Sequence, residues 1–141
     1  MGATGVRPFE NDAAIDWLAR AVTKDLGTAI DSAFRKLEPT LNRQPGATAS
    51  AHAVAAAALL ALAVKHNSKI NALLKSLGTS ITSVAAVSTP ERLKAARNAL
   101  VVVSSDRSRL YLEWEDSGLL KKWQSQLKAI DAVLAKADLE G

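Results

Sequence analysis

The sequence contains no cysteine. Without thiols, a disulfide framework, a thiolate nucleophile and a cysteine-ligated zinc site are all excluded. The absence is consistent with a reducing compartment, and we expect the protein in the cytoplasm. The opening stretch, MGATGVRPFEND, has no basic segment followed by an apolar run, so we expect no secretory signal.

Long hydrophobic runs are also missing. The most apolar stretch, Ala53–Val64, is shorter than the about 20 apolar residues that a membrane-spanning helix needs. Polar residues bound it closely, with Ser50 and His52 before it and Lys65 after it. We therefore interpret this stretch as a buried core helix and expect no membrane association.

Charge of one sign is not concentrated anywhere along the chain. The net charge is +4 over 141 residues, and the basic residues are scattered among acids. Nucleic-acid binders usually gather their basic residues into a stripe, so we do not expect nucleic acid as the partner. A weak binder of nucleic acid or of another anionic surface would use Arg92, Lys94, Arg97, Arg107 and Arg109.

Motifs that carry chemistry are absent as well. The sequence has no HExxH, P-loop, GxSxG or glycine-rich dinucleotide pattern. Its two histidines, His52 and His66, would lie about four turns apart on one helix and could not share a metal ion within a monomer. We therefore expect no cofactor, no metal and no catalytic residue that local spacing can identify.

Helical periodicity is what the sequence does contain. Between Asp12 and Leu37, apolar residues recur at steps of three and four, which predicts one helix that Gly27 weakens in the middle. Either Asn11 or Asp12 is a suitable cap. A length of 141 residues suits a single domain, 1–141, on which residues 1–10 would pack as an N-terminal arm.

The rest of the chain predicts further helices. Residues 48–66 carry alanine on nearly every face, which is typical of a helix at the centre of a fold. Residues 68–78 predict a short helix, whereas 79–88 fit a helix or a strand. Three further helices are expected, over residues 90–103 after the cap Thr89, before Gly118, and over residues 119–136. The prediction is an all-α bundle of five or six helices around the alanine-rich one.

An acidic cluster lies at the amino end, formed by Glu10, Asp12 and Asp16. Because Asp12 and Asp16 are four residues apart, they share one helix face and could bind a metal or act as an acid–base pair. Carboxylates also gather in a first turn simply to meet the helix dipole. We favour this structural interpretation, in which Phe9 and Trp17 are core anchors that hold the amino end against the final helices, near Trp114 and Trp123.

A second acidic cluster surrounds Trp114 and comprises Glu113, Glu115 and Asp116. Acids near the carboxyl end of a helix oppose its dipole, which makes this cluster the stronger candidate for a functional role. The structural interpretation, in which these acids pair with a basic residue such as Arg107 or Arg109, is nevertheless the one that we favour.

Both ends of the sequence resemble an uncharacterised bacterial family, the domain of unknown function numbered 4259. Members of this family resemble the sequence in two places. They begin with Phe-Glu-Asn-Asp followed by Asp-Trp-Leu, and near the end they carry a Trp-Glu stretch followed by a further tryptophan. The residues that match are Phe9, Glu10, Asn11, Asp12, Asp16, Trp17, Leu18, Ser108, Leu110, Trp114, Glu115, Asp116, Ser117 and Trp123. Three departures are Thr4 in place of a tryptophan, Ala58 in place of an acid, and a poor match over 68–88. The resemblance implies a small helical protein and no known activity.

Three functions remain open from the sequence. The favoured one is a non-catalytic interaction protein that binds another protein, for example as an immunity or antitoxin-type binder. The alternatives are an enzyme or metal-dependent site built from the two acidic clusters, and a weak nucleic-acid or anionic-surface binder. Candidate partner-binding residues are Glu10, Asp12, Asp16, Glu113, Glu115 and Asp116, and candidate structural anchors are Phe9, Asn11, Trp17, Trp114 and Trp123.

Overall fold

The computed structural model describes residues 9, 12–37, 47–64, 68–104 and 109–140. These residues form α-helices and no strand, which confirms the all-α class. The described residues form eight helices, rather than five or six. They are α1 (Asp12–Thr23), α2 (Leu26–Arg35), α3 (Ala47–Val64), α4 (Ser68–Ser76), α5 (Ile81–Ala86), α6 (Pro90–Val103), α7 (Arg109–Ser117) and α8 (Leu120–Glu140).

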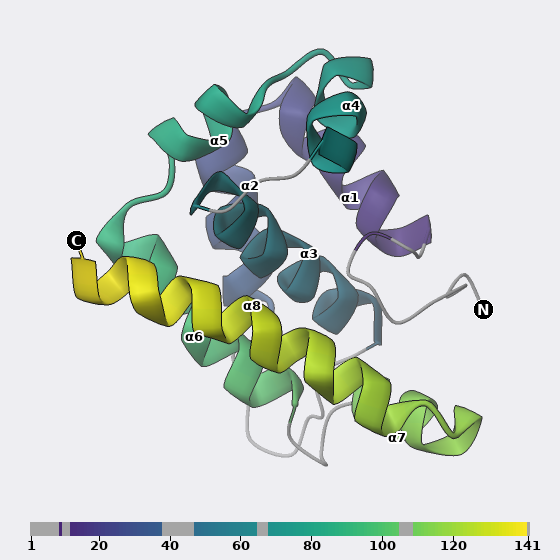
Figure 1. Ribbon diagram of the computed structural model, residues 1–141. Helices are drawn as coiled ribbons and strands as arrows, with labels where there is room; N and C mark the ends of the chain where they lie inside the picture. Colours follow the sequence, from purple (N-terminus) through teal and green to yellow (C-terminus); the bar gives the residue numbers. More distant parts are fainter. Residues whose placement is uncertain (1–8, 10–11, 38–46, 65–67, 105–108, 141) are drawn as a thin grey trace.

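The alanine-rich helix α3 occupies the centre of the fold (Figure 1). Helices α1, α2, α5, α6, α7 and α8 all pack against it. Every residue from Ala53 to Ala61 is buried, and exposed residues occur near the two ends of the helix, at Thr48 and at Val64, which is 45% exposed. The small alanine side chains explain this position, because they let neighbouring helices approach on several sides at once.

The prediction of a single helix from Asp12 to Leu37 was wrong, because the chain forms the two helices α1 and α2 instead. Asp25 interrupts it with an extended conformation, and its carboxylate accepts hydrogen bonds from the amides of Gly27 and Thr28. This is an N-cap, which starts a new helix in a new direction. The break also changes which side chains face inward: Ile15 is 38% exposed.

The carboxyl-terminal half follows its sequence signals closely. Thr89 caps α6 by accepting from the amide of Arg92, with Pro90 at the first helical position. The end signals of α4 and α7 also hold, because Gly78 and Gly118 adopt positive φ angles of 83° and 79°. The ambiguous residues 79–88 contain the short helix α5. Apolar residues at helical spacing predict the inner faces of α6 and α8. Of these residues, Leu120 is half-buried, and the following are buried: Leu93, Ala96, Leu100, Val103, Trp123, Leu127, Ile130 and Leu134.

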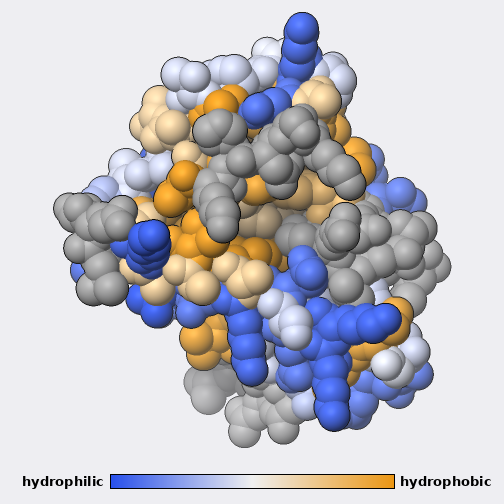
Figure 2. Space-filling view, viewed as in Figure 1, coloured by the Kyte–Doolittle hydropathy of each residue, from blue (hydrophilic) through white to orange (hydrophobic). Residues whose placement is uncertain are grey.

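Hydrophilic and hydrophobic side chains separate on the face that α8 crosses. Figure 2 shows hydrophilic residues gathered in the lower part of this face and hydrophobic ones above them, towards α5. Of the helices that the structure describes, none has both the length and the apolar character needed to cross a membrane.

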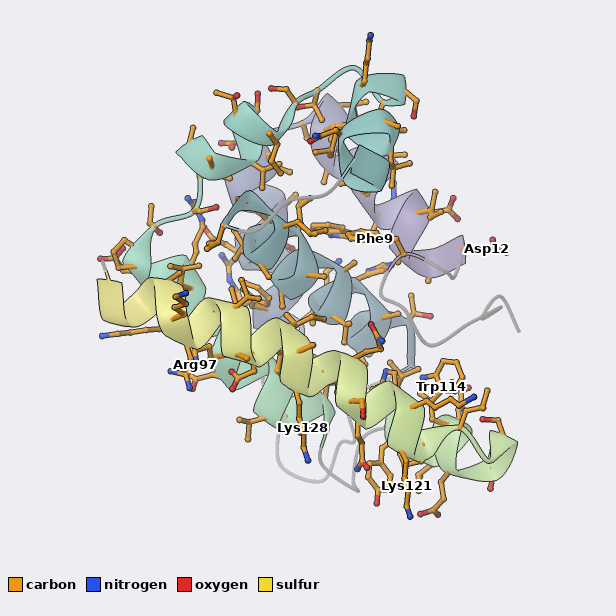
Figure 3. All side chains as sticks on the ribbon, viewed as in Figure 1. Phe9, Asp12, Arg97, Trp114, Lys121 and Lys128 are labelled. Carbon is orange, nitrogen blue, oxygen red and sulfur yellow. The ribbon has the colours of Figure 1, made fainter. Side chains whose placement is uncertain are left out.

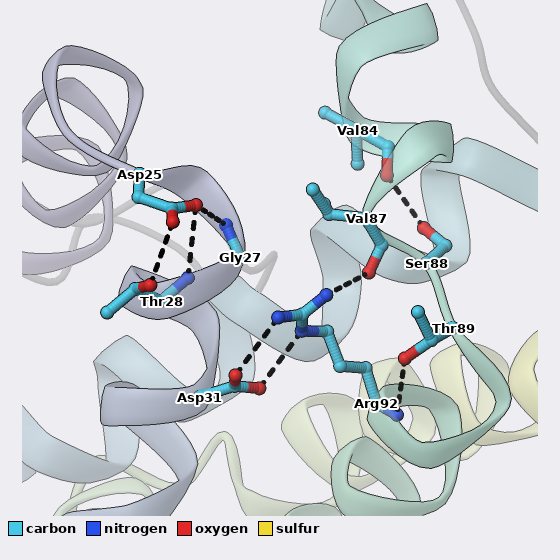
Figure 4. Close-up of polar contacts among 9 residues, drawn as sticks. All are labelled: Asp25, Gly27, Thr28, Asp31, Val84, Val87, Ser88, Thr89 and Arg92. Carbon is cyan, nitrogen blue, oxygen red and sulfur yellow. Dashed lines mark hydrogen bonds and ion pairs between the residues drawn. The ribbon is translucent and has the colours of Figure 1, made fainter.

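Helices α2 and α6 are joined by one arginine (Figure 4). Arg92 donates from Nε and Nη2 to the two carboxylate oxygens of Asp31, each at 3.0 Å, and from Nη1 to the carbonyl of Val87 at 3.1 Å. A Cβ added at Gly27 would lie 2.7 Å from Nη2 of Arg92. Gly27 therefore makes room for the guanidinium group where α2 meets α6.

This close approach predicts a non-additive effect of two substitutions. Alanine at an ordinary helical site is better than glycine by roughly 0.5–1 kcal/mol. In Gly27→Ala the new methyl group displaces the guanidinium, so we expect this gain only in an Arg92→Ala background. Urea unfolding of the wild type, both single variants and the double variant should give a coupling energy of about 1 kcal/mol. Additive effects would show that the guanidinium moves aside at no cost.

Candidate functional site

The first acidic cluster lies on the outer face of α1. Asp12 and Asp16 are both exposed, and Ile15 lies between them on the same face. Among the described residues, no ion pair engages either carboxylate. Glu10 and Asn11 lie outside the described residues, so their roles as a partner-binding residue and as a cap remain predictions.

The second cluster lies on α7. Glu115 and Asp116 are exposed, Glu113 is half-buried, and Leu112 is 37% exposed on the same face. Helix α1 packs mainly on α3 and α2, whereas α7 packs on α3 and α8, so the two clusters lie on helices that share no extensive contact with each other. Across the described ranges, no three Asp, Glu or His side chains are grouped so that they could hold a metal ion.

The basic residues that were candidates for binding an anionic surface have different surroundings in the structure. Arg92 is bound to Asp31, and Arg97 donates from Nε to Asp131 on α8 at 3.0 Å. Lys94 is exposed. Arg107 and the side chain of Arg109 lie outside the described part of the chain. The two arginines with described partners therefore tie helices together.

The expected aromatic anchors belong to one core. Trp17, Trp114 and Trp123 are 7%, 8% and 3% exposed, and Phe9 is half-buried against the same core. Their arrangement differs from the prediction in one respect. We expected the amino end to pack on the final helices near Trp114 and Trp123, whereas α1 packs chiefly on α3 and α2. Ala58 is buried in α3, so an acid at that position would be enclosed by apolar neighbours.

A groove between α1 and α2 is a feature that sequence reasoning missed. It has a volume of about 540 Å³ and opens to solvent. We call it the α1–α2 groove. Its lining residues are Trp17, Arg20, Ala21, Lys24, Asp25, Thr28, Ala29, Ser32, Ala33, Lys36 and His52.

The charged residues that line the α1–α2 groove are mainly cations. Arg20, Lys24 and Lys36 contribute three positive charges, and no described carboxylate forms an ion pair with any of them. Asp25 is the one acid in the lining, and its carboxylate already accepts from the hydroxyl of Thr28 at 3.0 Å as well as from the capped amides. These hydrogen bonds hold the pKa of Asp25 below its usual value.

His52 reaches the groove from α3. Burial lowers the pKa of its imidazole, and the positive charges of Arg20 and Lys36 lower it further, while Asp16 acts in the opposite direction. The imidazole is therefore neutral at pH 7 and can accept or donate one hydrogen bond. Arg20 of α1, Lys36 beyond α2 and His52 of α3 all line this one groove.

One sequence signal pointed towards this groove. Trp17, Arg20, Ala21 and Lys24 follow each other at steps of three and four, which places them on one helix face. The opposite wall depends on the break at Asp25, which turns α2 back beside α1. Without that break, the cations of the two helices would not have faced a common space.

Comparison with known proteins gives a family and no described activity. Curated proteins and solved structures gave no match. Residues 2–126 match the family described as Domain of unknown function (DUF4259). This stretch contains the groove and both acidic clusters and ends within α8. Since the match extends over most of the 141 residues, the protein belongs to the DUF4259 family.

Proposed function

We propose that this protein is a non-catalytic interaction protein that binds another protein through the outer faces of α1 and α7. The observation that carries the proposal is a shared surface pattern: each face exposes a large aliphatic side chain beside two carboxylates. Among the described residues, the exposed large hydrophobic side chains are Ile15, Val64, Val101 and Leu112. Two of these four therefore fall within the acidic clusters.

On α1, Asp12, Ile15 and Asp16 stand at positions i, i+3 and i+4, so they form one continuous patch. The carboxylates keep the patch soluble, and Ile15 supplies apolar area that a partner would remove from water. An exposed leucine-sized side chain is worth about 1.5–3 kcal/mol when it is fully buried.

On α7, Leu112, Glu115 and Asp116 repeat the same spacing. Both patches lie on the right of the view in Figure 1, where the amino end of α1 and the helix α7 are found. Figure 3 labels Asp12 and Trp114 in these two regions.

The chemistry of the two patches defines the partner. Carboxylates around an apolar centre are complementary to a surface that offers Lys or Arg around an apolar pocket. The net charge of +4 works against long-range attraction to such a partner, so recognition depends on close contact rather than on steering. An immunity or antitoxin-type binder in a bacterial cytoplasm is the form of this function that we favour.

Site-specific photocrosslinking in the native host tests the proposal. A benzophenone side chain is introduced at Ile15, at Leu112 or at Val101, which is 69% exposed on α6 and lies outside both clusters. We expect adducts with the same protein from positions 15 and 112 and none from position 101.

The partner identified in this way then allows a quantitative measurement. We expect Asp16→Asn, and Glu115→Gln combined with Asp116→Asn, to weaken its binding about tenfold each, equivalent to about 1.4 kcal/mol, with unchanged melting midpoints. Lys94→Gln, an exposed charge change on α6, serves as the control. Equal adducts at all three positions, or full affinity in both acidic variants, would refute a docking face on α1 and α7.

A further inference from the structure

We propose that the α1–α2 groove is a binding site for a small organic anion, with a carboxylate or phosphate head held by Arg20 and Lys36 and an apolar body lying along Trp17. This site is separate from the docking face proposed above. It borders that face, because Asp16 lies outside the groove and Trp17 and Arg20 line it.

The unbalanced positive charge of the groove indicates that the head group of the ligand is an anion. Three cations and one carboxylate, Asp25, line one space, so a net positive charge remains, and Asp25 is already engaged by Thr28 and by the amide of Gly27 at the start of α2 (Figure 4). Elsewhere in the described structure, Arg92 and Arg97 have carboxylate partners across helices. An anion between Arg20 and Lys36 would supply the charge that the groove lacks, and a guanidinium group binds carboxylates and phosphates in a bidentate manner.

The end of the groove near His52 is suited to receive this head group. Arg20, Lys36 and His52 all line the groove, so two positive charges and the imidazole border one common space. Ser32 also lines the groove, and its hydroxyl makes no hydrogen bond to another described residue, which leaves the hydroxyl available as a donor. A neutral imidazole adds one donor more.

The apolar floor of the groove indicates that the body of the ligand is apolar. Trp17, Ala21 and Ala33 are buried beneath the charged rim, and Ala29 is half-buried beside them. The apolar side chains that line the groove beside the indole ring are all alanines, Ala21 from α1 and Ala29 and Ala33 from α2. A groove of about 540 Å³ falls within the roughly 300–1,000 Å³ typical of small-molecule sites.

Four probes separate the contributions of head and body. Phenyl phosphate and benzoate each combine a ring with an anionic head, inorganic phosphate provides the head alone, and benzyl alcohol provides the ring alone. Binding is followed by NMR chemical-shift titration of the full chain at low ionic strength. We expect the two aromatic anions to bind at least tenfold more tightly than benzyl alcohol and more tightly than inorganic phosphate. Their relative affinities identify the preferred head group.

A charge-matched pair of double variants tests the residues. In Arg20→Gln with Lys36→Gln we expect at least a tenfold loss of affinity for the aromatic anions. The control, Lys121→Gln with Lys128→Gln, removes the same net charge from exposed positions on α8, well away from α1 and α2 (Figure 3). We expect it to leave the affinity within about twofold. Equal losses in both double variants would reduce the effect to net charge and overturn the proposal.

His52 provides a readout confined to the groove. A bound anion opposes the effect of Arg20 and Lys36, so the pKa of His52 should rise when phenyl phosphate or benzoate saturates the protein, and benzyl alcohol should leave it unchanged. Its ring resonance is assigned with His52→Gln. Anion binding that leaves the His52 pKa unchanged places the ligand elsewhere and refutes the site. Absence of saturable binding by both aromatic anions refutes it as well.

Discussion

Trp17→Ala is expected to destabilise the protein by about 3–5 kcal/mol, the largest effect of any single truncation considered for this chain. The indole is 7% exposed and lies where α1 meets the core formed with α2 and α3. Truncation removes its buried area and also leaves a cavity, because backbone atoms of packed helices follow only in part. A loss of this size is a large fraction of the 5–15 kcal/mol that stabilises a typical domain.

Urea unfolding followed by circular dichroism measures this loss. Ile15→Ala is the matched control, since it truncates a large side chain on the same helix that is already 38% exposed. We expect it to cost less than about 1 kcal/mol. A similar loss in both variants would mean that α1 contributes through helix formation rather than through burial of Trp17.

Local signals explain which helices could be predicted from the sequence. Thr89, Pro90 and Glu91 specify the start of α6 within consecutive residues, and Gly118 ends α7 through its own backbone conformation. The buried face of α8 could also be predicted, because apolar residues such as Trp123 and Leu127 recur at helical spacing over a long stretch. In each case the physical cause lies within a few residues of its effect.

The break between α1 and α2 was missed because the apolar spacing continues across Asp25, so periodicity alone favours one helix. Part of what distinguishes the broken form is local, since Asp25 caps α2 on the amides of Gly27 and Thr28. The other part is tertiary, since Arg92 reaches Asp31 across the fold and occupies the space beside Gly27. The glycine that weakens one long helix is the residue that permits this contact.

The candidate sites also differ in whether they depend on one helix or on several. Exposure of Asp12 and Asp16 on one face could be inferred from their spacing, and the structure places them there. The α1–α2 groove could not be inferred, because Lys36 and His52 join Arg20 only after α2 folds back and α3 packs beneath both helices. Sequence spacing finds residues that share one helix, whereas this groove combines three helices.

Ala57→Leu is expected to destabilise the protein by about 1–3 kcal/mol, although it adds a hydrophobic side chain to a hydrophobic helix. Ala57 is 0% exposed near the middle of α3, which six other helices contact. A leucine there has no space to fill, so it must take a strained rotamer or push a neighbouring helix outward. Alanine stabilises the protein at this position because its side chain is small.

The same substitution at an exposed helical site separates packing from composition. Ala129→Leu places a leucine on the exposed side of α8, where we expect a change within about 0.5 kcal/mol. Thermal unfolding of both variants, checked by the equilibrium urea transition, gives the comparison. An unchanged midpoint for Ala57→Leu would show that the helices around α3 can separate at little cost, and the small side chains of α3 would then not be what sets their distance.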